Sequence, residues 1–314
     1  MKLKRQQGVA VVTALLLTTL AVTIVASLFW QQQVQVRSME NQRLQLQTRW
    51  IVRGALDLSR LILNQDVNDS PNYTQLNGIW ATPLEETRLD DYVERERLQG
   101  ENFNATLSGR MEDAQGRFNL ANLAGSKWQA ETEVFERLLS NLRLDSSLAQ
   151  ATMQMVKNAT QTAQTAQTTQ TAQGATVSQP MGMVRVEDLL AVSGFTPQAI
   201  EQLRDYVIIL DHPTELNVNT APAELLSALV PGLSLSEAAA MVNTRKRNWY
   251  LDKSKFLGEP QMQGKTPGGS YGVRSDYFLA YSRVKLDRAT LDTQALLYRK
   301  GLTPLTTVKW IREY

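Results

Sequence analysis

Side chains that could carry out covalent or acid–base catalysis are scarce in this chain of 314 residues. It contains no cysteine, and its single histidine, His212, lies in the turn-like phrase Asp211-His212-Pro213. A nucleophilic Cys–His pair is therefore excluded, and one histidine cannot form a His-rich metal centre. We expect the His212 ring to be solvated or locally hydrogen-bonded. The sequence predicts a protein that is not an enzyme.

Acidic residues gather in one short stretch. Paired carboxylates there could serve acid–base chemistry or bind Ca²⁺, but their spacing does not match the EF-hand calcium loop. A solvated charged surface accounts for them without a function. The residues are Glu85, Glu86, Asp90, Asp91, Glu94 and Glu96.

The overall charge gives no case for nucleic acid as a partner. The chain has 33 basic and 31 acidic residues, and without the three basic residues of its first eight the counts are 30 and 31. Arg245, Lys246 and Arg247 form the one basic cluster in the second half, at the end of an expected helix, where the helix dipole stabilises cations.

The N-terminus has the composition of a membrane anchor. Lys2, Lys4 and Arg5 precede Gly8, and the 22 residues from Val9 to Trp30 carry no charge. A helix of that length reaches about 33 Å, enough to cross a hydrocarbon core of about 30 Å. Because basic residues stay on the cytoplasmic side, we expect everything after Trp30 to be periplasmic. A simple uncleaved anchor is one interpretation of this segment.

A basic leader, a glycine and then a long apolar helix also resemble the prepilin signal of type IV pilins and type II secretion pseudopilins. The resemblance implies cleavage by prepilin peptidase between Gly8 and Val9, followed by N-methylation of Val9. Members usually carry glutamate at the fifth mature position, which is Thr13 here. That departure resembles the K-type minor pseudopilin, the subunit placed at the tip. Alternatively, the Thr13 hydroxyl simply bonds to its own helix backbone.

The helix should continue beyond the membrane. Apolar residues recur at spacings of three, four and seven and predict one apolar stripe on a helix over residues 9–62. Asn, Asp, Ser and Pro between Asn64 and Tyr73 predict its end. The stripe comprises Val34, Leu44, Leu46, Trp50, Ile51, Ala55, Leu58, Leu61 and Ile62.

Extended structure should follow and then return at the end of the chain. Residues 105–111 and 117–120 predict a β-hairpin around Asp113–Gly116, and residues 277–286, 291–299 and 308–311 predict three further strands. The phrase from Gly109 to Leu123 resembles the hairpin phrase of K-type pseudopilins.

Between these strands the pattern is helical. Residues 158–179 consist almost wholly of Thr, Ala and Gln and predict a flexible loop. Two later segments, 187–200 and 224–238, repeat an apolar helix, a glycine turn (Gly194, Gly232) and a second helix, and predict helix-hairpin-helix units. Nucleic-acid-binding units use a Gly-x-Gly turn, but Thr196 and Ser234 stand at the second glycine position. Thr220 is a candidate N-cap for the helix after it.

The expected fold class is α+β: a pilin-like long N-terminal helix packed on an antiparallel sheet, with an inserted all-helical domain containing the helix-hairpin-helix units. The expected divisions are a leader (1–8), the N-terminal helix (9–62, with 9–30 in the membrane), a first α/β part (63–125), the helical insertion (126–262) and the final strands (263–314).

The resemblance to K-type pseudopilins runs from Gly8 to Ile311. It implies a subunit of the bacterial inner membrane, with one span and a periplasmic C-terminal domain, at the tip of a type II secretion pseudopilus, where it helps to start assembly and limits length. Its implied partners are the other minor pseudopilins, the major pseudopilin, prepilin peptidase and the inner membrane, with no nucleic acid. No cofactor is required; K-type members can hold Ca²⁺, but no motif assigns ligands here. A type IV pilus minor pilin and a membrane-anchored DNA-uptake protein are the alternatives.

Overall fold

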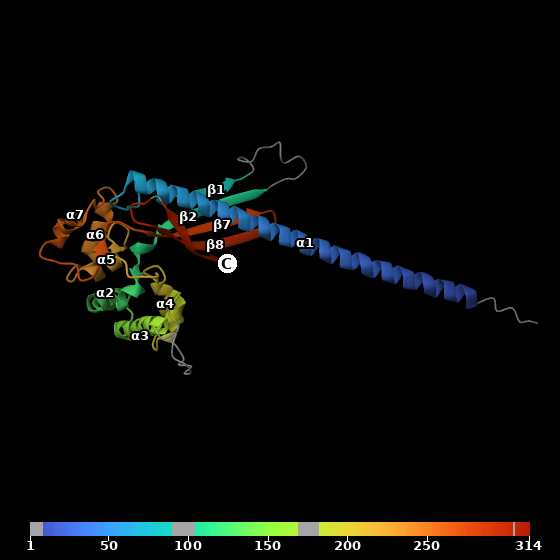
Figure 1. Cartoon of the computed structure of the whole chain (residues 1–314), viewed down its shortest axis with the longest axis horizontal. Coiled ribbons are helices and arrows are strands. Elements are labelled where there is room, and N and C mark those ends of the chain that lie inside the picture. The colour runs from blue at the N-terminus through green and yellow to red at the C-terminus, as the bar shows by residue number, and fades with distance from the viewer. Residues whose placement is uncertain (1–8, 90–103, 169–181, 304) are drawn as a thin grey trace, which may run out of the picture.

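One helix dominates the computed structural model of the chain, which describes residues 9–89, 104–168, 182–303 and 305–314. The helix α1 spans Val9–Asp69, and its first half projects far from the globular part (Figure 1). The leader 1–8, including Gly8, lies outside the described residues, as does most of the acidic stretch.

The boundary expected at residue 62 is too early: α1 continues to Asp69, which lies inside the Asn64–Tyr73 stretch predicted to end the helix. Leu63 and Val67 are buried in this extension, and the Asp66 carboxylate pairs with a buried arginine, Arg299. Packing and this ion pair outweigh the weak helix preference of Asn and Asp, which governed the prediction.

A five-stranded antiparallel sheet lies against the second half of α1. Its strands are β1 (Leu84–Arg88), β2 (Ala105–Asp113), β7 (Tyr277–Leu286), β8 (Ala289–Arg299) and β9 (Thr306–Glu313), in the order β1-β2-β7-β8-β9. The three C-terminal strands confirm the predicted extended segments. Alternate residues of β7 and β8, such as Phe278 and Leu297, pack with Val52 and Leu56 of α1.

The predicted hairpin of residues 105–120 is wrong. β2 pairs with β1 on one side and with β7 on the other, so both of its edges are occupied. After the 3₁₀ turn η4 (Ala114–Gly116), the short strand β3 (Phe118–Asn119) leaves the sheet and pairs in parallel with β4 (Val207–Ile208). The strand pattern was correct, but the partners are distant in sequence.

A helical region is inserted between β2 and β7, at the opposite end of the globular part from the projecting half of α1 (Figure 1). Its α-helices are α2 (Trp128–Asn141), α3 (Leu148–Thr168), α4 (Pro197–Leu203), α5 (Ala223–Leu229), α6 (Leu235–Arg245) and α7 (Lys253–Leu257). Short 3₁₀ segments η1 (Ile79–Ala81), η5 (Leu120–Ala124), η6 (Val186–Ala191) and η7 (Pro260–Met262), and a parallel pair of β5 (Leu216–Asn217) with β6 (Tyr271–Gly272), complete the fold.

The region has its own apolar core, separate from the core under α1. Phe118 and Phe135 stack in it with ring centroids 5.3 Å apart, beside fully buried leucines of α2 and α5. Both glycine turns have positive φ, +106° at Gly194 and +77° at Gly232, which only glycine adopts without strain. The first turn joins η6 to α4, and the second joins α5 to α6.

The prediction of a loop over residues 158–179 is wrong for its first part, because α3 extends to Thr168; residues 169–181 lie outside the described residues. Ala149, Met153 and Val156 anchor the start of α3 in the core. Once a helix is nucleated, each added residue costs little, and Ala and Gln have good helix propensity. Low hydrophobicity therefore did not mean absence of structure.

Candidate assembly interface

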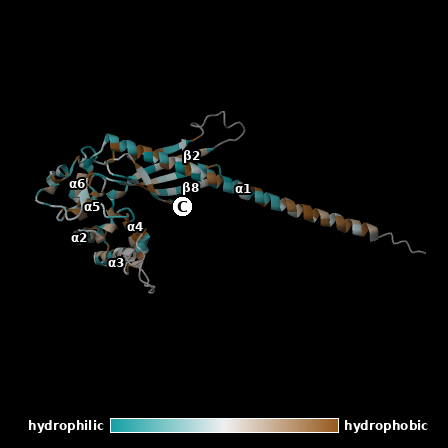
Figure 2. Cartoon of the chain, in the orientation of Figure 1, coloured by the Kyte–Doolittle hydropathy of each residue, from teal (hydrophilic) through white to brown (hydrophobic). Residues whose placement is uncertain are grey.

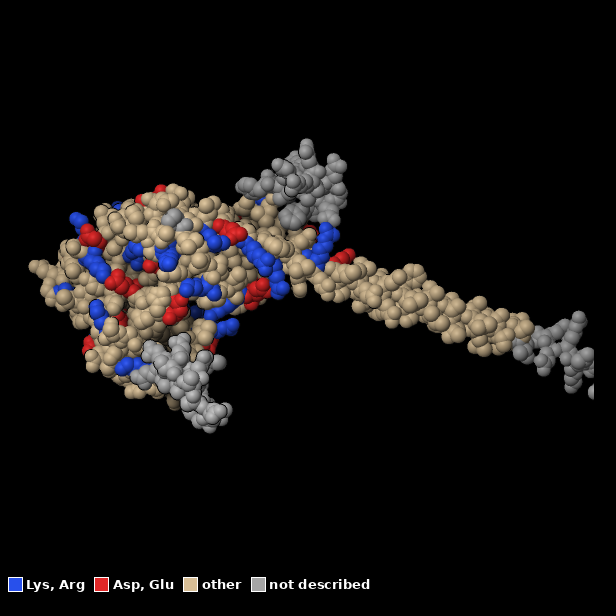
Figure 3. Space-filling view, in the orientation of Figure 1, with Lys and Arg blue, Asp and Glu red and all other residues tan. Residues whose placement is uncertain are grey.

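The first half of α1 presents apolar side chains all around its circumference. Leu17, Val22 and Phe29 are each about two thirds exposed, at 65%, 67% and 66%. Over residues 9–30, Figure 2 shows the helix as almost uniformly hydrophobic, and Figure 3 shows no charged residue on the face in view. It is long and apolar enough to cross a membrane. A helix that is apolar on every side needs lipid or other apolar helices around it.

The hydroxyl groups of this segment bond within the helix. The Oγ1 atoms of Thr13, Thr18 and Thr23 donate to carbonyls three residues earlier, at 3.0, 2.9 and 2.8 Å. This is the bond expected if Thr13 is simply a hydroxyl tolerated in an apolar helix. Because threonine is uncharged, a second subunit does not have to supply an amine opposite position 13. Val9 is the first residue of the helix.

The second half of α1 has two apolar faces rather than the single stripe that was predicted. One face, with Val52, Leu56 and Leu63, is buried on the sheet. The other, here called the outer stripe, carries Leu46, Trp50, Leu58 and Leu61, which are exposed at 57%, 65%, 44% and 65%. These positions recur at spacings of three, four and eight, so they share one side of the helix.

Gly54 lies in the middle of the outer stripe. A Cβ atom placed on it would meet nothing within 4 Å, so the fold of this chain does not require glycine there. Glycine inside a helix costs about 1 kcal/mol relative to alanine. A small residue between exposed large ones lets another helix approach closely. The outer stripe is therefore the part of the globular domain best suited to contact a partner helix.

Charged contacts fasten the sheet to α1 near the point where the helix leaves it. The Nη2 atom of Arg288, in the β7–β8 turn, lies 3.1 Å from Glu40 Oε2 and 2.9 Å from Asn41 Oδ1. Arg49 pairs with Glu313 of β9 at 2.9 Å. Both pairs are exposed, so each contributes at most about 1 kcal/mol.

A buried ion pair holds the other end of α1. Arg299, at the end of β8, is fully buried, and its Nη1 atom donates to Asp66 Oδ2 at 2.6 Å. Its Nη2 atom donates to Thr74 Oγ1 at 3.0 Å and to the Ser275 carbonyl at 2.8 Å. Burial raises the pKa of Asp66, and the bond from Arg299 opposes that effect.

A second buried polar centre, around Asp113, joins the sheet to the helical insertion. Its Oδ2 atom accepts from Ser275 Oγ at 2.6 Å, Thr220 Oγ1 at 2.6 Å and Asn217 Nδ2 at 2.8 Å, while Oδ1 accepts from the Gln115 backbone at 2.8 Å. Burial raises the pKa of Asp113 despite these bonds.

The Asp113 bonds also overturn the prediction that Thr220 caps a helix. α5 begins at Ala223 with Pro222 at the N-cap position, and the Thr220 hydroxyl is committed to Asp113. Sequence reasoning did not identify Asp66, Asp113 or Arg299, because the side chains that pair with the two carboxylates are distant along the chain: Arg299 is 233 residues from Asp66, and Asn217 is 104 residues from Asp113.

Among the residues considered for chemistry, those that the structure describes are engaged with separate partners. The His212 side chain is half exposed, as expected, with Nδ1 2.8 Å from Asp211 Oδ1 and 3.1 Å from the Tyr277 hydroxyl. Glu86 pairs with Lys285 at 2.9 Å on the surface. Within the described part of the chain, no three His, Asp or Glu side chains are grouped to hold a metal ion. Asp90, Asp91, Glu94 and Glu96 lie outside it, so the Ca²⁺ prediction stays untested.

The basic cluster after α6 does not form one basic patch. Arg245 is buried and donates to the carbonyl oxygens of Val218 and Ala221, so it supports the approach to α5. At the two glycine turns, the Thr196 and Ser234 hydroxyls accept from backbone N–H groups of α4 and α6, each at 3.2 Å. These residues act as helix N-caps.

Comparison with known families matches the helical insertion. A family model described as "Type II secretion system (T2SS), protein K" matches residues 216–274, and a second model of the same description matches residues 116–213. The two matches adjoin and together cover β3, the inserted helices and β6.

Several curated proteins are similar to the chain over most of their length. The type II secretion system protein K of Klebsiella pneumoniae is 27% identical, across 95% of this chain and 94% of its own. That of Pseudomonas aeruginosa is also 27% identical, across 90% and 85%. A chain in the crystal structure of the GspK-GspI-GspJ complex from enterotoxigenic Escherichia coli has the same fold, with a TM-score of 0.68 and 18% identity over 88% of this chain and 99% of that chain.

Proposed function

Because the chain belongs to the type II secretion system protein K family, we propose that it is a non-enzymatic minor pseudopilin that occupies the tip of the pseudopilus, helps to initiate assembly and limits pilus length. Prepilin peptidase would cut between Gly8 and Val9, and the Val9 amine would be methylated. The globular part would lie in the periplasm and the first half of α1 in the inner membrane.

The observation that carries this proposal is the double apolar character of α1. Its first half is apolar on all sides, and the outer stripe continues an exposed apolar face along the part that packs on the sheet. Lipid can cover the first half, but the outer stripe lies beside the globular part, where only a protein can cover it. A helix of this kind can move from the bilayer into a bundle of similar helices without exposing new apolar surface.

The tip position is supported by where the extra bulk lies. The helical insertion sits at the end of the globular part opposite the projecting helix (Figure 1), where a further subunit would have to stack. The uncharged Thr13 needs no counter-charge from such a subunit.

The proposed partners are other minor pseudopilins first and the major pseudopilin below them. The similar fold comes from a complex whose title names GspI and GspJ beside GspK, so proteins of those two types are the first candidates. We assign their contact to the outer stripe around Gly54.

Processing tests the signal. Gly8→Leu should leave the full precursor in membranes that contain prepilin peptidase, whereas Gln7→Leu, the matched control one residue away, should be cut and methylated normally. Intact-mass measurement of the purified chain distinguishes the two. Complete cleavage of the Gly8→Leu chain would contradict the assigned signal.

Co-purification tests the assembly surface. The full chain in detergent micelles is captured together with co-expressed minor pseudopilins. Gly54→Leu should reduce their recovery strongly, because the added side chain enters the close contact but meets nothing within the chain itself. Gln202→Leu adds an exposed leucine on α4, far from α1, and should leave recovery unchanged. Equal recovery with both variants would exclude the outer stripe as the contact.

A further inference from the structure

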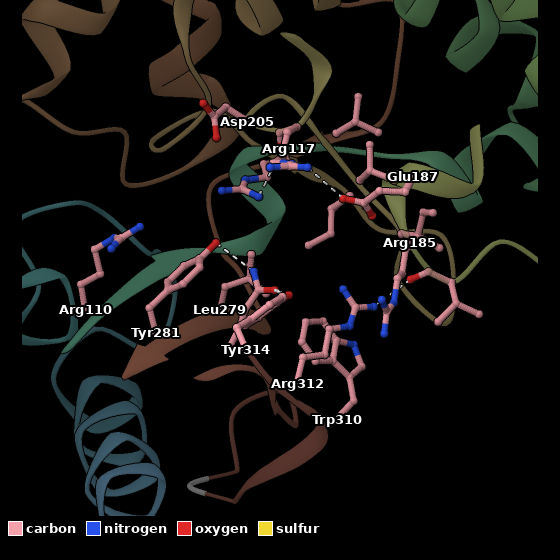
Figure 4. Close-up of a pocket in the computed structure, with 17 residues that line it drawn as sticks. Arg110, Arg117, Arg185, Glu187, Asp205, Leu279, Tyr281, Trp310, Arg312 and Tyr314 are labelled. Carbon is pink, nitrogen blue, oxygen red and sulfur yellow. Dashed lines mark hydrogen bonds and ion pairs between the residues drawn. The ribbon is translucent and has the colours of Figure 1, made fainter. Parts of the chain in front are cut away.

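A groove lies between the helical insertion and the face of the sheet that α1 does not cover. It contains a cavity of about 410 Å³, whose lining is drawn in Figure 4. Side chains of β2, β7, β8 and β9 form one wall, and η6 and the segment from α4 to β4 form the other. Residues distant in sequence, such as Arg110, Arg185 and Arg312, thereby line one cavity.

The cavity is lined by five arginines and only two acidic residues, with no lysine. Two of the arginines share one carboxylate: Arg110 and Arg117 lie 2.9 and 2.7 Å from the two oxygens of Glu112. The five arginines are Arg110, Arg117, Arg185, Arg204 and Arg312, and the two acids are Glu187 and Asp205.

In the part of the chain that the structure describes, Arg185 and Arg312 form no ion pair, and Glu187 of the cavity is already paired with Arg204 at 3.2 Å. The Arg312 Nη2 atom donates to the carbonyl of Val184, directly before Arg185, at 3.0 Å, and its guanidinium lies 4.0 Å from the Trp310 ring centroid. Figure 4 shows both arginines entering the same side of the cavity. Two neighbouring guanidinium groups repel each other unless an anion lies between them, and their planar forks match a carboxylate.

The groove is longer than a small anion needs. A second hollow of about 520 Å³ continues along the sheet face as far as Pro83 and shares four lining residues with the first: Arg110, Tyr281, Gln294 and Tyr314. Gln294 bridges the two tyrosine hydroxyls, at 3.0 and 3.2 Å. These side chains can give up their hydrogen bonds to one another and instead bond to the backbone of a peptide that lies across them.

The charge distribution selects the kind of occupant. In the second hollow Arg283 is neutralised by a bidentate pair with Asp292, at 2.6 and 3.1 Å. Unpaired positive charge is therefore confined to one end, whereas a nucleic acid needs cations along its whole path. We propose that this groove binds an extended acidic peptide segment of a partner protein, with its carboxylates on Arg185 and Arg312. The site goes beyond the pilus-tip function and does not depend on it.

Fluorescence anisotropy with the full chain in detergent micelles tests this site. The probe is a labelled peptide of about ten residues with alternating Glu and Thr, which places every carboxylate on one side of an extended chain. The Arg185→Gln/Arg312→Gln variant should bind it at least about tenfold more weakly, as expected from losing charge-assisted hydrogen bonds. The same peptide with Gln in place of Glu should bind neither protein.

The matched control is Arg143→Gln/Arg247→Gln, which removes the same charge at exposed positions outside the groove and should bind like the unchanged chain. Equal weakening by both double variants would reduce the effect to net charge and overturn the proposal. Tighter binding of a single-stranded oligonucleotide of equal charge would also overturn it. An unchanged thermal midpoint of each variant shows that folding is not the cause of any loss.

Discussion

Replacing Arg299 by methionine should be among the most damaging single changes in the globular part. The side chain is fully buried, and it satisfies Asp66, Thr74 and the Ser275 carbonyl together. Methionine fills much of the volume but leaves the Asp66 carboxylate buried without a cation. Loss of one partner of a buried pair costs about 3–5 kcal/mol, so we expect the free energy of unfolding to fall by that amount.

The measurement is urea unfolding of the full chain in micelles, followed by near-UV circular dichroism of the buried aromatics of the sheet. Asp66→Asn alone should cost a comparable amount, because it leaves the buried Arg299 guanidinium without a counter-charge even though the bonds to Thr74 and Ser275 remain. The double variant should lose less stability than the sum of the two single losses, by about 1–3 kcal/mol, because no buried charge is then left without its partner.

A surface pair provides the matched control. Arg283→Met breaks a bidentate pair with Asp292 whose side chains are 58% and 41% exposed, and it should cost less than about 1 kcal/mol. If Arg299→Met were equally mild, or if the two buried losses simply added, then this pair would not hold the end of α1 to the sheet.

Two further predictions concern the helical insertion and its junction. Burial raises the pKa of Asp113, so its contribution to stability is full below about pH 4 and is lost as the pH rises through the raised value. Asp113→Asn should therefore make the free energy of unfolding decline less steeply with pH above about pH 4. Urea unfolding at a series of pH values measures this, and an unchanged pH dependence would refute the prediction. Gly194→Ala should cost about 1–3 kcal/mol, because φ is +106° and the new Cβ would lie 2.7 Å from Leu148 Cδ2. At Gly232, where φ is +77° and nothing lies within 4 Å, the same change should cost only about 1 kcal/mol in thermal unfolding.

The parts of the fold that the sequence predicted are those with a local physical signal. Alternation over Tyr277–Leu286 was sufficient for β7, because every second side chain faces α1. The membrane segment was predicted from composition alone, because an uncharged, apolar run of 22 residues is typical of a helix that spans a bilayer. Gly194 and Gly232 were read as turns, where positive φ requires glycine.

The errors arose where distant residues decide a local conformation. Asn64 and Asp66 favour a helix end in isolation, but Arg299 makes Asp66 a helical core residue. Phe118 and Asn119 are extended as predicted, yet their partner is Val207–Ile208 because β7 already occupies β2. No spacing rule identifies such partners without a structure.

The candidate interface was only half visible in the sequence, for a related reason. A periodic stripe shows that a helix has an apolar side, but it does not show how many sides will be covered. Leu58 and Ala55 were placed in one stripe, whereas the sheet buries Ala55 and leaves Leu58 exposed. The arginine groove had no sequence signal at all, because its lining comes from strands and loops that are spread along the chain from Arg110 to Tyr314.

The two buried polar centres explain how a subunit with a flat sheet and a bulky insertion can behave as one body. They are directly joined: Ser275 presents its carbonyl to Arg299 and its hydroxyl to Asp113, and Thr74 accepts from Arg299 and from the Ser275 backbone. The last turns of α1 are thereby connected through buried bonds to the loop that begins α5. A partner that fixes α1 also fixes the orientation of the insertion, so the groove beside it keeps a constant position relative to the membrane helix.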